Sequence, residues 1–390
     1  MVLLPQFTEN PPLTLYVHLP WCVQKCPYCD FNSHALNQQP LPEADYVSAL
    51  LRDVELELPL IWGRPIESIF FGGGTPSLFS PAAFDQLLSG LRARLDLRFC
   101  REITLEVNPG TEMAGHLADY RTLGITRVSI GVQSFHAEHL KRLGRIHDPA
   151  AAIRAIESAH AAGFDSFNID LMHGLPEQTA AEAAADLAQA IALAPPHLSW
   201  YQLTLEPNTP FAAFPPALPD DDTLEAITQQ GQDALHAAGY GHYEVSAFAR
   251  AGHQSVHNRN YWEYGDYLGI GAGAHGKITL AAENAIERRM RPRHPSRFLA
   301  QAGQAEALEI QRVSPSELAF EFMLNALRLT DGFAVPLFTE RTGLPLKTIS
   351  NTLQTLEQEQ LIEWTIQRIR PTPRGLRYLN EVLLRFMPDE

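Results

Sequence analysis

The chain has 390 residues, of which 45% are hydrophobic and 19% charged, a composition typical of folded proteins with more than one core. Its formal net charge is −15, from 30 basic and 45 acidic residues, and such a field repels phosphate backbones, so nucleic acid is not an expected partner. No run approaches the roughly 20 apolar residues of a transmembrane helix, and Met1–Pro12 lacks the features of a signal peptide. The sequence therefore predicts a cytoplasmic protein with reduced thiols and leaves its oligomeric state open.

Strand and helix patterns alternate six times between Leu13 and Glu206. The predicted strands are Leu13–Leu19, Ser68–Phe71, Glu102–Val107, Arg127–Ile130, Ser166–Asp170 and Leu198–Leu203. The predicted helices include Glu43–Leu58, Pro81–Leu95 and Thr179–Leu193, the last beginning with a capping box of Thr179 and Glu182. This alternation predicts an α/β fold with a parallel sheet, here a partial (β/α)6 barrel over residues 1–210. A doubly wound open sheet is the alternative that the pattern leaves open.

The pattern weakens after Pro207, and an α+β extension with a Gly-rich segment at 267–276 is expected over residues 211–313. A winged-helix-like domain is expected over residues 314–390. Its predicted elements are the helices Val335–Arg341 and Lys347–Gln358 around Gly343, and a hairpin wing from Leu361–Ile369 with Pro371–Gly375. Residues 331–390 carry seven basic and eight acidic side chains, which favours a packing or partner module over a DNA-binding one.

Three of the four cysteines lie within eight residues: Cys22, Cys26 and Cys29. In a reducing compartment this spacing indicates a metal site. Three thiolates from one loop can hold three irons of a [4Fe–4S] cluster and leave the fourth iron open. Zinc is the alternative, with His18 or His34 as the fourth ligand, although the chain has no second cysteine pair. Cys100 precedes the strand Glu102–Val107, so it is expected at the opposite end of the sheet as a buried thiol.

The sequence around the cysteines resembles the radical S-adenosylmethionine (SAM) family. The matching residues run from Tyr16 to Cys22 and from Cys26 to Phe31. More narrowly, nearly the whole chain is similar to the branch that contains oxygen-independent coproporphyrinogen III oxidases and HemW-type heme chaperones. In that family the open iron is chelated by the amino and carboxylate groups of SAM. The resemblance implies a [4Fe–4S] cluster on the three cysteines and SAM as a cofactor.

The glycine-rich run Gly72–Pro76 follows an apolar strand. Glycines let a backbone approach a ligand and present its N–H groups, although a tight turn is an equal alternative for the run alone. The resemblance implies that Gly73, Gly74 and Thr75 contact SAM and that the run holds its amino group. It places further SAM contacts at Tyr16, Tyr28, Glu106, Gln133, Arg145, Asp170 and Thr204. Carboxylates suit hydroxyl groups or positive charge, and an arginine suits the SAM carboxylate.

Two features distinguish the chaperones from the oxidases in this branch. Oxidases carry a fourth cysteine two residues after the third, where this chain has Phe31. The chain also carries the residues of the HNxxYW signature of HemW-type chaperones: His257, Asn258, Tyr261 and Trp262. The resemblance therefore implies a heme chaperone that binds heme and transfers it to acceptor hemoproteins, without oxidase activity. Oxidation of coproporphyrinogen III by a SAM-derived radical is the alternative.

The four signature residues are the predicted heme contacts. Histidine is a common axial ligand of heme iron, and aromatic rings suit a porphyrin face. A structural interpretation is equally open, in which His257 holds a turn with Asn258 while the two rings pack. A basic run offers partners for heme propionates, although a solvated surface stretch is favoured: Arg288, Arg289, Arg291, Arg293 and Arg297.

Overall fold

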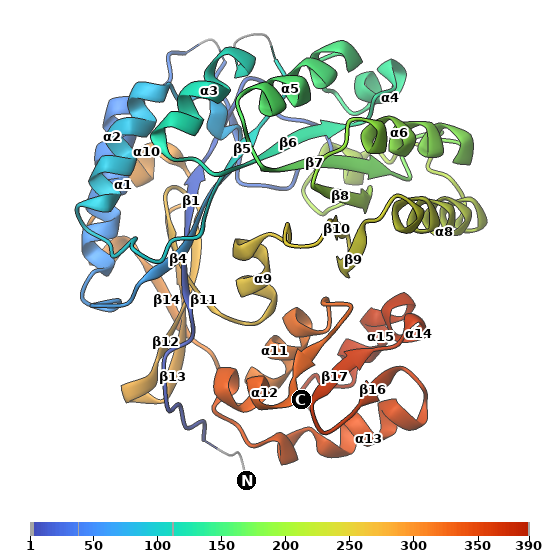
Figure 1. Ribbon diagram of the computed structural model, residues 1–390. Coiled ribbons are helices and arrows are strands. Elements are labelled where there is room, and N and C mark those ends of the chain that lie inside the picture. Colours follow the sequence, from blue (N-terminus) through green and yellow to red (C-terminus); the bar gives the residue numbers. More distant parts are fainter. Residues whose placement is uncertain (1–3, 38, 111–112, 389–390) are drawn as a thin grey trace.

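A single curved sheet forms the frame of the molecule (Figure 1). The computed structural model describes residues 4–37, 39–110 and 113–388. Residues 1–3 and 389–390, where the first and last predicted domains begin and end, lie outside this part. The sheet has 12 strands in the order β14-β13-β12-β11-β1-β4-β5-β6-β7-β8-β10-β9. Within the described ranges, no helix is long and apolar enough to cross a membrane.

The six predicted strands form the parallel centre of this sheet. They are β1 (Leu13–Leu19), β4 (Ile66–Gly73), β5 (Glu102–Val107), β6 (Arg127–Gln133), β7 (Ser166–His173) and β8 (His197–Gln202). The helices that cover the convex face are α1 (Glu43–Glu57), α2 (Pro81–Arg92), α3 (Met113–Leu123), α4 (Ala137–Arg142), α5 (Pro149–Ala161) and α6 (Ala180–Ala192). The capping box of Thr179 and Glu182 at α6 is confirmed. Because the sheet does not close on itself, the predicted partial barrel is confirmed as well.

The extension continues the same sheet at both edges. The Gly-rich segment contains a strand that the sequence did not predict, β11 (Asp266–Ile270), which pairs in parallel with β1. Antiparallel strands follow it: β12 (His275–Leu280), β13 (Ala285–Met290) and β14 (Glu309–Arg312). At the other edge, β10 (Ala247–Ala249) is antiparallel to β8, and β9 (Gly241–Glu244) is antiparallel to β10. Strand β11 was not predicted because glycines are uncommon inside strands. Glycine is required there, since a β-carbon on Gly269 would overlap the carbonyl oxygen of His275.

Short elements complete this part of the chain. They are β2 (Trp21–Cys22), β3 (His34–Ala35), α7 (Pro210–Ala213), α8 (Asp221–Ala237), α9 (Val256–Trp262) and α10 (Pro295–Gln301). Figure 1 shows α9 on the concave side of the sheet, between the sheet and the C-terminal helices. Because side chains alternate along each strand, the concave face is lined by polar residues while the convex face packs an apolar core against the helices.

The C-terminal part has its own hydrophobic core, in which Phe322, Phe333 and Phe338 meet edge to face. Its helices are α11 (Leu318–Ala326), α12 (Val335–Thr342), α13 (Ser350–Gln358), α14 (Pro373–Arg377) and α15 (Leu379–Leu384), and its strands β15 (Phe333–Ala334), β16 (Ile362–Trp364) and β17 (Arg368–Pro371) form a small sheet. Gly343 ends α12 with a φ of 67°, as the helix-turn-helix prediction required. The predicted wing is wrong beyond Pro371, because α14 begins at Pro373 with Thr372 as its cap.

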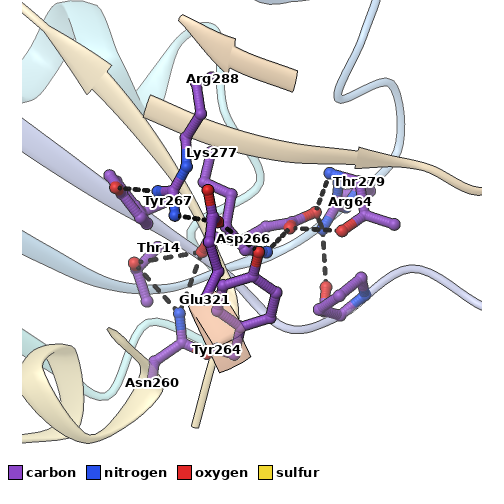
Figure 2. A network of polar contacts seen from close by, with 11 residues as sticks. Thr14, Arg64, Asn260, Tyr264, Asp266, Tyr267, Lys277, Thr279, Arg288 and Glu321 are labelled. Carbon is purple, nitrogen blue, oxygen red and sulfur yellow. Dashed lines mark hydrogen bonds and ion pairs between the residues drawn. The ribbon is translucent and has the colours of Figure 1, made fainter. Parts of the chain in front are cut away.

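Buried charges hold the extension to the barrel and to the C-terminal part (Figure 2). The carboxylate of Asp266 accepts hydrogen bonds from Lys277 at 2.8 Å and Arg64 at 2.8 Å. Burial alone would raise the pKa of Asp266, but these two cations together hold it below its ordinary value. Farther along, Arg288 donates to Glu321 of α11 at 2.6 Å.

The predicted interpretations of the basic run are therefore wrong for three of its members. Arg288 is paired with Glu321, as Figure 2 shows. Arg289 and Arg291 are buried and contact acidic groups of α1, with Arg291 donating to Glu57 at 2.6 Å. These side chains are neither a solvated stretch nor free for heme propionates, because a buried cation needs a carboxylate partner close by. Arg293 and Arg297 are exposed.

Candidate cofactor site

The cysteine loop leaves the carboxyl end of β1 and is fixed at both of its ends. Strand β3 pairs in parallel with β2, which carries Cys22, and the amide of His34 donates to the carbonyl of Pro20 at 2.7 Å. Inside the loop, the ammonium of Lys25 donates to the carbonyls of Phe31 at 2.9 Å and Ser33 at 3.3 Å. The loop is thus closed by contacts to its own main chain, and none of its three thiols is used in a disulfide.

The thiol chemistry suits an iron–sulfur cluster. All three cysteines are free. Burial raises the pKa of Cys22 and of Cys29, so a metal must displace protons to bind there. The guanidinium of Arg145 lies 3.8 Å from the sulfur of Cys26 and can balance thiolate charge. In the described residues no group of three or more His, Cys, Asp or Glu side chains is arranged to hold a metal ion, so the cluster and its zinc alternative both stay predictions.

Cys100 lies where the sequence predicted, away from this loop. It precedes β5 at the amino end of the sheet, and its sulfur donates to the carbonyl of Glu102 at 3.5 Å. Burial raises the pKa of its thiol to about 11. Such a thiol stays protonated at neutral pH, so it behaves as a small apolar side chain.

The glycine run packs directly beneath the cysteine loop. The amides of Gly74 and Thr75 donate to the carbonyls of Leu19 and Trp21 at 2.8 and 2.7 Å, and Gly73 donates to Glu106 at 3.1 Å. A β-carbon on Gly74 would lie 2.5 Å from the carbonyl oxygen of Trp21. The expectation that the run presents free N–H groups to a ligand is therefore wrong, because the protein itself uses them. An ammonium group needs acceptors, and the run offers its carbonyl oxygens and the adjacent Glu106 carboxylate for that purpose.

Two of the predicted carboxylates, Glu106 and Asp170, are buried inside the barrel, and the charge of Asp170 acts on Glu106. Burial, and then the charge of Asp170, raise the pKa of Glu106 from 4.5 to about 8. Burial also raises the pKa of Asp170, against the hydrogen bonds that it accepts from Ser129 at 3.0 Å and Asn168 at 2.8 Å. The charge of Arg127 acts against this rise at Asp170, but burial outweighs it. A ligand with a positive charge or several hydroxyl groups would favour their ionised forms.

A hydrogen-bonded chain joins the cluster loop to the pocket. Arg145 donates to Asn108 at 2.9 Å, Asn108 donates to Thr75 at 2.8 Å, and Thr75 donates to the sulfur of Cys22 at 3.5 Å. Asn108 was not among the predicted site residues, although its position at the end of β5 was a usable signal. Thr75, Asn108 and Arg145 line a small hollow of about 170 Å³ together with Cys26.

The remaining predicted SAM contacts comprise three residues near the other site residues and one exposed residue. Gln133 ends β6 with a φ of 69° and accepts a hydrogen bond from Tyr201 at 2.7 Å, so Tyr201 is a second residue that the sequence did not indicate. Burial raises the pKa of Tyr16 and of Tyr28, and each lies near an ionisable site residue, Glu106 and Arg145 respectively. Thr204 differs from this group, because its side chain is exposed and donates to Glu206.

The predicted heme contacts lie elsewhere, on α9. The imidazole of His257 is enclosed: its Nδ1 lies 3.2 Å from the hydroxyl of Ser68, and its ring centroid lies 5.1 Å from that of Phe70. Its amide donates to Glu102 at 3.2 Å, at the start of β5. Burial lowers the pKa of His257 to about 3. The ring therefore faces the barrel interior from the amino ends of the strands, opposite the cysteine loop.

The aromatic pair of the signature faces the C-terminal part. The Tyr261 and Trp262 rings meet edge to face at 5.0 Å, and the guanidinium of Arg328 lies 4.3 Å from the Trp262 ring centroid. The cap of α9 is Ser255, whose hydroxyl accepts from the amide of Asn258 at 3.3 Å. The signature thus anchors α9 between the two parts of the molecule, and heme contact by Asn258, Tyr261 or Trp262 stays a prediction.

Comparisons with known proteins agree with this architecture. Residues 16–188 match the radical SAM superfamily, and residues 313–378 match the HemN C-terminal domain. The chain is 51% identical to the heme chaperone HemW of Escherichia coli (strain K12), covering 97% of this chain and 99% of that protein, and 48% identical to HemW of Haemophilus influenzae with the same coverage. The solved structure of the coproporphyrinogen III oxidase HemN from Escherichia coli is similar with a TM-score of 0.81 and 25% identity, over 97% of this chain and 90% of that one. The chain belongs to the HemW family of heme chaperones, within the radical SAM superfamily.

Proposed function

We propose that this protein binds heme and transfers it to acceptor hemoproteins, with a [4Fe–4S] cluster and SAM as its cofactors. The observation that carries the proposal is the 51% identity to a heme chaperone over 97% of the chain. Phe31 in place of the oxidase cysteine supports the same assignment, since a phenyl ring offers neither a thiol nor a proton.

The cluster belongs on Cys22, Cys26 and Cys29, and SAM at the carboxyl ends of β4, β5, β6 and β7 beside them, next to the hollow that Thr75 and Arg145 line. Bound there, the cluster would supply an open iron for the amino and carboxylate groups of SAM. Glu106 and the carbonyls of the glycine run suit the ammonium, and Arg145 suits the carboxylate. Gln133 and Asp170 suit the ribose and the remaining polar atoms. Exposed Thr204 is the least supported member of this set.

The experiment that tests this function is a titration under anaerobic conditions. The full chain, with its cluster reconstituted, should bind ferric heme with a saturable change in absorption and should pass it to an apo-hemoprotein. The same preparation, given SAM and a reductant, should leave coproporphyrinogen III unchanged. Phe31→Cys alone should not create oxidase activity, because it alters one side chain of the site only. Turnover of coproporphyrinogen III by the unmodified protein would refute the proposal and establish the oxidase alternative.

A further inference from the structure

The last residue of β6 has a strained backbone. Gln133 has a φ of 69°, in a region that residues other than glycine, asparagine and aspartate seldom adopt. It is buried, and its side-chain oxygen accepts a hydrogen bond from the hydroxyl of Tyr201 at 2.7 Å. Such strain persists only where the surrounding structure holds it, and it is concentrated at functional sites. Other residues must therefore hold Gln133 in this conformation.

The main chain is irregular on both sides of Gln133. The pairing of β6 with β7 shifts by one residue between Gly131 and Gln133, so Val132 is an extra residue in the ladder. Such β-bulges redirect side chains and are common beside active sites. After the bulge, the amide of Ser134 donates to the carbonyl of Val132 at 2.9 Å. With a positive φ at the central residue, this is the rare and strained form of the γ-turn.

A buried carboxylate on a neighbouring helix holds this turn. Asp186 of α6 accepts hydrogen bonds from the hydroxyl of Ser134 at 2.6 Å and from the amide of Phe135 at 2.7 Å, one on each of its oxygens. The Ser134 hydroxyl in turn accepts from the amide of His136 at 3.0 Å. Asp186 is 4% exposed. It therefore fixes the two residues that directly follow Gln133, from a helix far along the chain.

The segment held in this way carries two of the predicted SAM contacts, one at each end of α4. Gln133 precedes the helix, and Arg145 follows it. Arg145 donates to the carbonyl of Gly131 at 2.7 Å, so both residues meet at the end of β6. Asp186 lies on a helix that covers the convex face of the sheet. Its effect on a ligand inside the barrel would therefore pass through the turn at Gln133.

The contact with Tyr201 determines what Gln133 can offer a ligand. Because the Tyr201 hydroxyl donates to the side-chain oxygen of Gln133, the NH2 group is the part that can donate to a ligand. SAM has acceptors for such a donor in its ribose hydroxyls, its adenine nitrogens and its carboxylate. A turn that relaxed to an ordinary φ would point this NH2 group in another direction.

We propose that Asp186 is a positioning residue for SAM, which holds the turn at Gln133 so that the glutamine amide is directed to the cofactor. This inference rests on the proposed SAM site and adds a residue outside the barrel that determines its geometry. A carboxylate suits this role because it accepts from an O–H and an N–H group at once, one on each oxygen, whereas an amide accepts on one atom only.

The test is a double-mutant cycle on SAM affinity, measured by isothermal titration of the full, cluster-loaded chain under anaerobic conditions. Gln133→Ala should raise the Kd for SAM at least about tenfold, since it removes a buried hydrogen bond. Asp186→Ala should raise the Kd to a similar extent in the parent chain, but by less than about twofold in the Gln133→Ala chain. Asp186→Asn should recover part of the affinity, because its oxygen can still accept from Phe135. Ser134→Ala removes one of the two contacts and should raise the Kd by a smaller factor than Asp186→Ala, which tests the proposal even where Asp186→Ala does not fold.

Leu187→Ala is the matched control, because Leu187 is the next residue of α6 and is buried in the apolar core. It should lower the midpoint of thermal unfolding without changing the Kd for SAM. Iron and sulfide contents, measured on each variant, show whether the cluster is retained.

Three outcomes would overturn the inference, and they are distinguishable. Equal fold-changes for Asp186→Ala in the parent and in the Gln133→Ala chain would refute action through Gln133 while the SAM site stands. An unchanged Kd in Gln133→Ala would refute the contact between Gln133 and SAM. A parent chain that binds no SAM would refute the cofactor part of the proposed function itself.

Discussion

At neutral pH, Glu106 should lower the free energy of unfolding of the cofactor-free protein, and the variant Glu106→Gln should therefore be more stable than the parent. The carboxyl is buried, and its pKa rises from 4.5 to about 8 on folding. At pH 7 the unfolded chain has released this proton, whereas the native state keeps it. The two states differ in this way over the 2.5 pH units between the unfolded pKa of 4.5 and pH 7. At about 1.4 kcal/mol per unit, the native state loses about 3 kcal/mol of unfolding free energy relative to a neutral side chain.

The sign of the effect follows from proton binding. A carboxyl whose folded pKa is raised binds more protons in the native state, so stability falls as pH rises from about 4.5 to about 8. Glutamine has no proton to lose, and its amide oxygen can still accept the hydrogen bond of Gly73. The gain from Glu106→Gln should therefore be absent near pH 4.5, reach about 3 kcal/mol at pH 7 and level off above pH 8.

Urea unfolding of the reduced, cluster-free chain, followed by tryptophan fluorescence at four pH values between 5 and 8, measures this difference. The exposed Glu157 on α5 provides the matched control, because Glu157→Gln should change stability by less than about 0.5 kcal/mol at every pH. A Glu106→Gln variant that is less stable than the parent at pH 8, or equally affected at all four pH values, would show that the buried carboxyl is not a cost to folding.

Three further outcomes test the cofactor site. SAM affinity should fall by up to about tenfold per pH unit below pH 8, because a cationic ligand must displace the proton of Glu106, and isothermal titration of Glu106→Gln should show a flat profile. Gly74→Val should abolish SAM binding, as its side chain would overlap the Trp21 carbonyl, and unaltered binding would disprove the pocket. Cys26→Ala should lose the cluster while Cys100→Ala keeps its iron and sulfide; iron loss in the latter would contradict its placement.

Much of the fold and of the site could be predicted from short stretches of the sequence. The six central strands were predicted because strands buried on both faces read as short apolar runs, and β1 and β5 have the predicted bounds. The site residues on those strands followed, since the carboxyl ends of parallel strands meet at one edge. The cysteine spacing and the run from Gly72 to Pro76 are equally local.

Other features depended on contacts between distant segments, which no local pattern records. Strand β11 was hidden by glycines that its neighbours require. Arg289 and Arg291 looked like a surface stretch, because their partners on α1 lie more than 200 residues away. The same holds for His34, which the sequence offered only as a possible zinc ligand, and His294, because the two are adjacent only in the folded chain. Residue type and spacing therefore determined the cofactor loops, whereas tertiary packing decided which charges are buried and which histidines meet.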